Sequence, residues 1–538
     1  MTGHGPWQDA AALADLRRRG AMVVKLGQRQ IALFATAGGG LHACNNRCPH
    51  EGYPLAEGHL DEHGVLTCQW HNWKFKLCSG ANLLGGDALR IYPVRETDGR
   101  VEIDLSEPAP EQVQAGALTQ FDAAMADEDR PRIARELARL EAAGGRVETA
   151  LARAVATSHE HLRYGMTHAY AAVDAWLSLR DGLSDPAQKL AAATEAAAHI
   201  AHDALREPIW PYTDVEQPWH AAHFLAAVQA QDEAGALALL QGALAQGLGL
   251  EQLEPVLARA ALAHYNDFGH ALIYLGHLPG LVKRLGTDSL RPLLRAWLRA
   301  LVMATREDLL PDFKAYAPAL ARWPVQPRAA GQHEAADPAR FEALTVRQTL
   351  DATLAAAAHM APEAVLNGLL HAAAHHLLRF DERWATRDDS KVADQVGWLD
   401  FSHAITFAQA LRRLGRRHAE LWPAGLLQLA LFVGRNTPYL AAEMSPTAAM
   451  AGWQVADLEA FDNAARLGLV DHGLGLDIFS VHRVKTFLAV QQALADGVPP
   501  ALAGALHAAL NRLLAARFKQ RHALRGARQA LDMVSREA

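Results

Sequence analysis

Two stretches near the N-terminus, "CPHEGYPLAEG" (48–58) and "CQWHNWKFKLCSG" (68–80), decide how this chain of 538 residues begins. The first opens with Cys-x-His and the second with Cys-x-x-His, and seventeen residues separate the two pairs. We expect each pair to lie at the tip of a loop, so that the two tips meet at one site. Each tip then offers one thiolate and one imidazole, so the four ligands can divide as two cysteines on one metal and two histidines on another.

Short apolar runs surround these two stretches between about residues 22 and 105. Seven runs have the length and composition of strands: "AMVVKLG", "QIALF", "GLHAC", "GVLTCQW", "WKFKL", "RIYPV" and "RVEIDL". Segments rich in Gly, Asp and Asn, such as "AGGG", "DEHG" and "ETDGR", supply turns between them. This pattern predicts a small antiparallel barrel or sandwich.

The two stretches resemble the ligand loops of the Rieske [2Fe-2S] ferredoxin-type domain found in bacterial Rieske ferredoxins and ring-hydroxylating oxygenases. The likeness covers about residues 20–106 and includes Pro49 between the first two ligands and Trp70 before the last histidine. It implies a Rieske-type [2Fe-2S] cluster bound by Cys48, His50, Cys68 and His71. In such clusters two imidazoles replace two thiolates on one iron, which raises the reduction potential to about −150 to +300 mV.

Some features of the loops depart from the family pattern. Asn72 stands where the family commonly has glycine, which predicts a slightly altered turn. The other cysteines do not lie directly beside the ligand pairs, so the resemblance implies the type without a disulfide. A structural zinc site remains the alternative, built from Cys44, Cys48, Cys68 and Cys78. Because it leaves both ligand histidines unexplained, we expect Cys44 and Cys78 to be small buried residues on strands.

The periodicity of apolar residues changes at about Leu118. Patterns with a period of 3.6 residues, such as "RIARELARLEAAG" and "LRPLLRAWLRALV", predict helices over the remainder, and a proline-containing break near residues 323–341 interrupts them. The predicted fold is therefore a small all-β domain followed by a large all-α region. The predicted boundaries are a Rieske domain at 1–106, a linker at 107–118, and helical lobes at 119–330 and 331–538.

Composition limits the class of protein. Half of the residues are apolar, about a fifth are charged, and the net charge is −7, which argues against a nucleic-acid-binding surface. No apolar run approaches the roughly 20 residues of a membrane helix, and no signal segment is recognisable. Four cysteines, all in the first 80 residues, are too few for a disulfide scaffold. We expect a cytoplasmic protein that binds neither nucleic acid nor a membrane.

Histidine is concentrated in the helical region, where 21 of the 27 histidines lie. Two segments, "YNDFGHALIYLGHL" and "WLDFSHAITFAQAL", share the pattern Asp-Phe-x-His-Ala. Helices that each carry a carboxylate three residues before a histidine are similar to those of di-iron bundle proteins, which use Glu-x-x-His on two helices. The pattern predicts a metal site, and its candidate catalytic residues are Asp267, His270, Asp400 and His403.

Other histidine groups compete with this assignment. Helical spacing also brings together Glu195 with His199 and His202, His161 with His168, and His371 with His375. A single histidine on an Ala- and Leu-rich helix is more often a structural residue than a ligand. Hints of a duplication give offsets of 203 (His168 to His371), 212 (His270 to His482) and 133 (Asp267 to Asp400), and these disagree.

The sequence therefore predicts an oxidoreductase that resembles oxygenases. Its Rieske cluster would relay single electrons to a His-rich helical region, where iron or another metal would support O2-dependent oxidation or reduction of a small organic substrate. No dinucleotide-binding fingerprint is present, which implies an external NAD(P)H-dependent reductase or a ferredoxin as electron donor. The alternative is a non-catalytic redox sensor, or a tethered Rieske ferredoxin whose helical region docks a partner protein.

Overall fold

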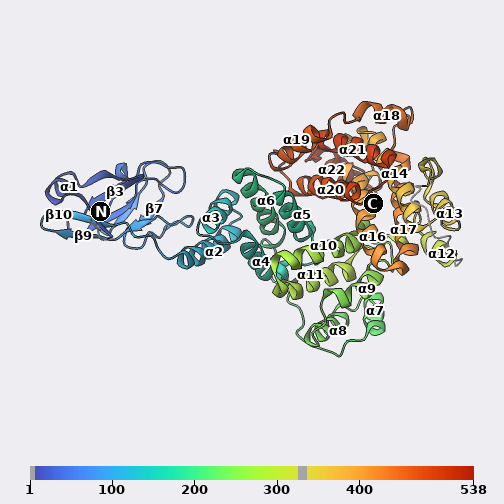
Figure 1. Ribbon diagram of the computed structural model, residues 1–538, viewed down its shortest axis with the longest axis horizontal. Coiled ribbons are helices and arrows are strands. Elements are labelled where there is room, and N and C mark those ends of the chain that lie inside the picture. Colours follow the sequence, from blue (N-terminus) through green and yellow to red (C-terminus); the bar gives the residue numbers. More distant parts are fainter. Residues whose placement is uncertain (1–5, 325–335, 538) are drawn as a thin grey trace. The chain divides into compact units, whose positions relative to one another are not determined.

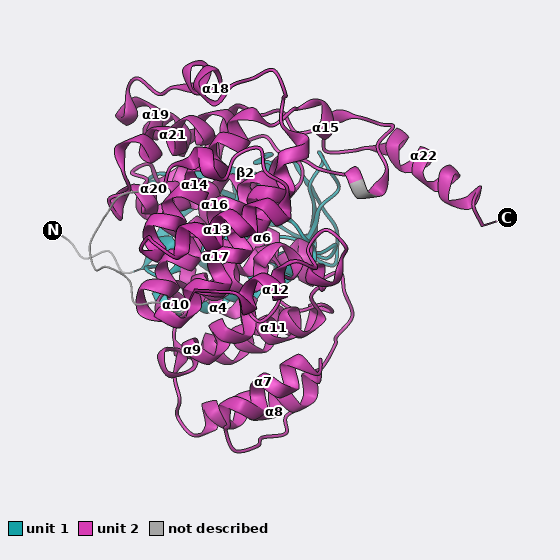
Figure 2. Cartoon of the chain, turned by 90° about the vertical axis from the view of Figure 1, so that its right-hand side faces the viewer, with its two compact units in different colours: residues 1–146 teal, residues 147–538 magenta. Residues whose placement is uncertain are grey.

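The computed structural model describes residues 6–324 and 336–537 and divides into two compact units, Met1–Arg146 and Val147–Ala538 (Figures 1 and 2). The first unit contains β-sheets followed by two helices, and the second is helical. The predicted fold class, a small β domain followed by a large all-α region, is confirmed. None of the described helices is long and apolar enough to span a membrane.

The described part of the first unit contains three antiparallel sheets, with strand orders β1-β10-β9, β2-β3-β4-β8 and β5-β6-β7. The strands are β1 (Trp7–Ala12), β2 (Ala21–Leu26), β3 (Arg29–Ala35), β4 (Leu41–Asn45), β5 (His59–Leu60), β6 (Val65–Thr67), β7 (Lys74–Lys76), β8 (Ile91–Tyr92), β9 (Val94–Thr97) and β10 (Arg100–Asp104). Each of the seven predicted runs contains a strand. β1, β5 and β9 were not predicted, nor was the short helix α1 (Leu13–Arg19).

Strand β3 lies between two hydrophobic cores. Successive side chains of a strand point to opposite faces, so Ile31 and Leu33 enter one core while Ala32 and Phe34 enter the other. The second core also contains Cys48 and Cys68, together with Phe75 of β7. The two cysteines of the predicted cluster site are thus fixed by the same packing that holds the sheets together.

Helices α2 (Pro110–Ala126) and α3 (Arg130–Ala142) complete the first unit. Most of the predicted linker, 107–118, lies in α2, because Pro110 is compatible with the first turn of a helix. Asp87 is fully buried and accepts hydrogen bonds from Arg135 and Arg139 of α3, which ties the helices to the β domain. Residues 110–118 of the predicted linker are thus helical and belong to the first unit.

The second unit consists of helices packed through Ala- and Leu-rich faces. They are α4 (Val147–Ser158), α5 (His168–Asp181), α6 (Pro186–Ala204), α7 (Ala221–Gln229), α8 (Glu233–Ala245), α9 (Leu250–Ala261), α10 (His270–Leu285), α11 (Leu290–Met303), α12 (Tyr316–Ala321), α13 (Val346–Ala357), α14 (Pro362–Arg379), α15 (Arg383–Thr386), α16 (Trp398–Arg417), α17 (Trp422–Asn436), α18 (Pro446–Trp453), α19 (Leu458–Val470), α20 (Asp477–Ala495), α21 (Pro500–Ala515) and α22 (Ala523–Val534). The predicted division into two lobes stays a prediction, and its boundary at residues 330 and 331 lies outside the described residues.

Four of these helices surround a common centre. α5 packs against α10, α10 against α16, α16 against α20, and α20 against α5, so the four helices form a closed ring (Figure 1). Gly276 allows close approach between α10 and α16, because a Cβ at this position would lie 3.3 Å from the Cβ of Ala410. Each helix of the ring carries one histidine in its first or second turn, namely His168, His270, His403 and His482.

Candidate functional site

The tips of the two predicted ligand loops meet in the first unit. Cys48 and Cys68 are buried, with 4% and 1% of their surfaces exposed. The Nδ1 atoms of His50 and His71 lie 3.2 Å apart at the surface. The structure therefore brings together the four residues that the sequence selected, with sulfur on the buried side and imidazole on the outer side.

Both loops use the same backbone turn to present their ligands. In each, the cysteine N–H donates to the carbonyl five residues further on, at 2.9 Å from Cys48 and 2.8 Å from Cys68. The residue four positions after the cysteine donates back to the cysteine carbonyl and has a positive φ, 79° for Gly52 and 59° for Asn72. Asparagine tolerates this left-handed conformation better than most residues, so Asn72 takes the conformation that Gly52 has in the first loop.

The surroundings of these ligands suit a cluster with thiolate and imidazole donors. Burial raises the pKa of Cys48 to about 11, while backbone N–H groups of His50 and Glu51 at the sulfur act in the opposite direction. A bound metal would supply the positive charge that keeps the buried sulfur ionised. Trp73 stacks on His50 with ring centroids 4.6 Å apart, which fixes one imidazole at the tip.

Comparison with known proteins agrees with this arrangement. The family model for the Rieske [2Fe-2S] domain matches residues 6–89. The ferredoxin component of the alkene monooxygenase system of Xanthobacter autotrophicus is 34% identical over 108 residues, which are 20% of this chain and 87% of that protein. The chain belongs to the Rieske [2Fe-2S] family. The cofactor of its Rieske domain is accordingly a Rieske-type [2Fe-2S] cluster.

Two further proteins match a part of the chain. The 3-phenylpropionate/cinnamic acid dioxygenase ferredoxin subunit of Escherichia coli K12 is 38% identical over 82 residues, which are 15% of this chain and 76% of that protein. The solved structure of the Sphingomonas yanoikuyae B1 ferredoxin is 22% identical, with a TM-score of 0.17, and covers 18% of this chain and 98% of that one. These matches span a fifth of the chain or less, so the helical region has to be interpreted from its own residues.

The predictions for Cys44 and Cys78 have different outcomes. Cys44 is buried on β4, as predicted. Cys78 is exposed and follows β7, so the prediction of a buried strand residue is wrong there. With Cys78 at the surface and both ligand histidines at the loop tips, the four cysteines do not share one buried position of the kind that a structural zinc site needs.

The histidines of the four-helix ring form a second candidate site, here called the histidine centre (His168, His270, His403 and His482). The Nε2 atom of His403 lies 2.8 Å from Nε2 of His270 and 3.3 Å from Nε2 of His482. The ring of His168 lies with its centroid 4.6 Å from that of His270 and 4.4 Å from that of His482. Ligand atoms of His168, His270 and His403 all lie within 4.8 Å of one another.

The hydrogen bonds of these imidazoles determine which nitrogen faces the centre. Nδ1 of His403 lies 2.6 Å from the carbonyl oxygen of Leu399, and Nδ1 of His482 lies 2.7 Å from that of Ile478. A carbonyl oxygen only accepts, so both Nδ1 atoms carry the proton, and in a neutral ring the lone pair is then on Nε2. The Nε2 lone pairs of His403 and His482 consequently meet with no hydrogen between them. Two nitrogens about 2.1 Å from one metal are about 3.0 to 3.4 Å apart, close to the distances observed.

Electrostatics favours neutral rings in the histidine centre. Burial lowers the pKa of His168, His403 and His482 well below the usual value, and the neighbouring cations and imidazoles lower it further. Lys485, only 2% exposed, lies with Nζ 2.9 Å from Nδ1 of His168, and burial lowers its pKa to about 7. Neutral imidazoles that converge in a site closed to water are the ligands that iron, copper and zinc accept.

A strained turn places the fourth imidazole. Asp267, Phe268 and Gly269 have φ values of 38°, 52° and 71°, a left-handed run that is unfavourable for the two residues with a Cβ. The Phe268 N–H donates to Glu307 at 2.9 Å, and Arg435 lies 4.0 Å from the centroid of the Phe268 ring. These contacts hold the turn against its own strain, as is common at functional sites.

The turn brings the carboxylate of Asp267 to His270 rather than into the histidine centre. Its Oδ2 atom lies 3.2 Å from Nδ1 of His270. Burial would raise the pKa of Asp267, but its hydrogen bond with His270 outweighs burial, and the pKa is lowered. A carboxylate that accepts from Nδ1 leaves Nε2 of His270 free to face His403, the usual arrangement behind a metal-bound histidine.

Asp400, the other predicted carboxylate, lies away from the imidazoles. It accepts a hydrogen bond from the N–H of Gly397 at 2.8 Å, which satisfies the start of α16, and its Oδ1 lies 3.4 Å from Arg435. Burial raises the pKa of Asp400, and Arg435 opposes this. The structure thus groups His270 and His403, puts Asp267 behind His270, and assigns Asp400 to the network that supports the turn.

His168, His482 and Lys485 were not predicted as members of the centre. The usable signal was the position of the two histidines in the first two turns of their helices, which His270 and His403 share, and Lys485 follows His482 by one turn. Members of the competing groups have partners of their own: Glu195 bonds to His472 at 3.1 Å, His199 to Asp203 at 3.3 Å and His161 to the Glu207 carbonyl at 2.7 Å. The rings of His371 and His375 do meet, with centroids 4.5 Å apart, but His375 is bonded to Glu342 at 2.6 Å.

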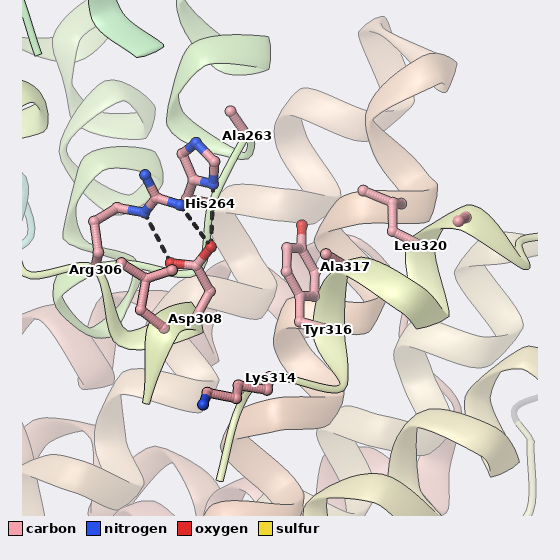
Figure 3. Close-up of a pocket in the computed structure, with 10 residues that line it drawn as sticks. Ala263, His264, Arg306, Asp308, Lys314, Tyr316, Ala317 and Leu320 are labelled. Atoms are coloured by element: carbon pink, nitrogen blue, oxygen red, sulfur yellow. Dashed lines mark hydrogen bonds and ion pairs between the residues drawn. The ribbon is translucent and has the colours of Figure 1, made fainter. Parts of the chain in front are cut away.

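A pocket elsewhere in the helical unit lacks such groups. Figure 3 shows this cavity of about 760 Å³, whose ionisable residues bond largely to one another. Asp308 accepts from Arg306 at 2.8 Å and lies 3.1 Å from Nδ1 of His264, while the Tyr316 hydroxyl donates to the Leu262 carbonyl. No residue of the histidine centre lines it. The histidine centre is therefore the stronger candidate for chemistry.

Proposed function

We propose that this protein is an oxidoreductase in which the Rieske domain relays single electrons to a metal held by the histidine centre. Iron or another redox-active metal at the centre would support the O2-dependent oxidation, or the reduction, of a small organic substrate. The observation that carries the proposal is the convergence of unprotonated Nε2 atoms, 2.8 and 3.3 Å apart, in a buried site. Without a cation these lone pairs would repel one another.

Each group of residues has a defined part in this proposal. Cys48, His50, Cys68 and His71 would hold the cluster, which accepts and releases one electron at a time when bound. His168, His270, His403 and His482 would hold the second metal, which would supply a site for O2 or substrate. Asp267 fixes the orientation of His270, and Lys485 contacts Nδ1 of His168.

The electron donor would be a separate protein. The chain lacks a recognisable dinucleotide-binding fingerprint, which favours an external NAD(P)H-dependent reductase or a ferredoxin. The names of the relatives support this, because one is the ferredoxin component of a monooxygenase system and another is a ferredoxin subunit of a dioxygenase. Ferredoxins of this type take part in electron-transfer chains that contain more than one protein.

Metal analysis of anaerobically purified protein tests the proposal. We expect about three metal ions per chain, two of them cluster irons accompanied by acid-labile sulfide. His403→Ala should remove the third ion and leave the visible and EPR spectra of the cluster unchanged. His371→Ala, at a similarly buried position outside the centre, is the matched control and should keep all three.

The alternative function predicts a different count. A redox sensor or tethered ferredoxin would contain two irons and sulfide only, and His403→Ala would leave its metal content unchanged. That result would refute the metal site in the helical region while leaving the Rieske domain intact.

A further inference from the structure

A second cavity of about 830 Å³ lies between the four helices that surround the histidine centre, α5, α10, α16 and α20. Three residues of its lining follow the histidines by one helical turn: Ile273 after His270, Thr406 after His403, and Lys485 after His482. One turn rises about 5 Å, so the cavity begins next to the histidine centre. Its size is in the range of about 300 to 1,000 Å³ that is typical of pockets for small organic ligands.

Small and apolar side chains line part of the walls of this cavity. Ala175, Ile273, Ala410, Leu488 and Ala489 line it, and they come from all four helices of the ring. These side chains suit an apolar body with a flat or slender shape. Polar residues lie along the whole cavity, from Thr406 and Lys485 near the histidine centre to Arg416 and Asp496 toward the C-terminal ends of α16 and α20.

Most charged groups of the lining are already engaged. Asp174 lies 3.0 Å from Nδ1 of His277 and 3.4 Å from Arg284. Asp496 is paired with Arg416 at 3.3 Å, and it also accepts from Gln409 at 3.0 Å. These carboxylates therefore have partners without a ligand.

Arg413 differs from its neighbours Arg416 and Arg417. Arg417 donates to Glu254 at 2.7 Å, and Arg416 is bonded to Glu363. Arg413 donates at 2.7 Å to the carbonyl of Gly276, and within the described ranges no carboxylate lies within ion-pair distance of it. Its guanidinium has five N–H donors in a planar fork, a geometry that matches a carboxylate.

We propose that the cavity binds the substrate, and that the substrate is an apolar organic monocarboxylate whose carboxylate pairs with Arg413 while its apolar end points toward the histidine centre. This inference rests on the proposed function for the role of the ligand as substrate. Arg413 follows Thr406 by seven residues, about 10 Å along α16, which is the length available to the apolar body. Arg413, the arginine of the lining that lacks a carboxylate partner within the described ranges, lies among lining residues that include Asp174 and Asp496, which suits one negative charge better than the two of a phosphate monoester.

Calorimetric titration of the full-length protein with 2-naphthoate and its neutral analogue 2-naphthamide tests this assignment. We expect naphthoate to bind about ten-fold more tightly or better, because the ion pair adds a charge-assisted hydrogen bond. Arg413→Gln should remove this preference, whereas Arg413→Lys should retain part of it. Arg322→Gln, which breaks an exposed pair with Asp351 outside the cavity, is the control and should bind like the wild type.

A second variant tests the location independently. Ala489→Trp fills the cavity and should weaken both ligands, with circular dichroism confirming that the variant is folded. Equal affinities for naphthoate and naphthamide, no effect of Arg413→Gln, or no binding of naphthoate would each overturn the assignment. Selective binding in a protein that lacks the third metal would support the cavity and refute the proposed function. A protein that holds the third metal but does not bind naphthoate selectively would refute the cavity assignment and support the proposed function.

Discussion

The two Asp-Phe-x-His segments offer a matched pair of substitutions, Asp267→Asn and Asp400→Asn. Asp267 lies 3.2 Å from Nδ1 of His270, so its carboxylate orients a proposed metal ligand. Loss of such a supporting carboxylate typically weakens metal binding by about 10- to 100-fold. Because 47% of the Asp267 side chain is exposed, water can replace part of the interaction. We therefore expect about ten-fold weaker binding, equivalent to about 1.4 kcal/mol.

Asp400→Asn should leave metal affinity unchanged. The amide oxygen of asparagine can still accept the Gly397 N–H, and the contact with Arg435 at 3.4 Å is long. Burial raises the pKa of Asp400, so its folded form favours the neutral acid. Such a group contributes stability below its unfolded pKa of about 4 and loses it as pH rises through the folded value. At neutral pH a neutral asparagine avoids the burial of a charge.

The assay is competition for the third metal between the protein and a chelator of known affinity, with urea unfolding as the control for stability. Both substitutions replace one carboxylate oxygen by an amide nitrogen in the same sequence pattern. A difference between the two variants therefore reports where each aspartate lies in the structure and not the pattern itself. The reasoning is refuted if Asp400→Asn weakens metal binding as much as Asp267→Asn does, or if neither changes it.

Three further substitutions test other parts of the structure. His50→Cys adds a thiolate to the cluster and should lower its reduction potential toward about −400 mV in a redox titration; an unchanged potential would contradict the ligand assignment. Asp87→Asn removes the acceptor of two half-exposed arginines and should lower the unfolding free energy by about 2 kcal/mol. Since Arg135 and Arg139 outweigh burial and lower the pKa of Asp87, the wild type should lose this stability as pH falls below about 4, which urea curves across pH would detect. Burial lowers the pKa of His376 to about 4, whereas the unfolded chain takes up the proton near pH 6.5. Wild-type stability should therefore fall relative to His376→Met as pH drops from 6.5 to 4, by up to about 1.4 kcal/mol per pH unit, and parallel stability curves would contradict this.

The Rieske domain was predictable because its site is encoded locally. Each ligand pair lies within one tight turn, and the spacing of Cys and His inside a turn determines which atoms can share a cluster. Edge elements such as β1 were missed, because "WQDAAA" has little strand propensity and pairs only through distant β10. The start of α2 was missed for a similar reason. Its residues have linker composition, and the helix is held by contacts with other elements of the first unit.

The histidine centre could be predicted only in part, because its consecutive histidines lie 79 to 133 residues apart along the chain. Sequence repetition found His270 and His403, whose rings meet, but it treated both aspartates alike. Asp267 precedes its helix in a left-handed turn and can reach back to His270. Asp400 already lies in α16, where the ring of His403 uses the Leu399 carbonyl instead. Identical spacing in different backbone conformations therefore gives different contacts.

The two sites have one electrostatic feature in common that bears on the direction of electron flow. In the Rieske cluster, neutral imidazoles replace thiolates and raise the potential because less negative charge compensates the iron. The proposed metal in the histidine centre would have only neutral imidazoles around it, with Lys485 2.9 Å from one of them and a carboxylate reaching only the outer nitrogen of another. Such a site would stabilise the reduced metal for the same reason that the imidazoles do in the cluster. A metal with thiolate or carboxylate ligands would require a stronger reductant. Under the proposed function, histidine at both sites would therefore favour an electron moving from the cluster to the metal of the helical region.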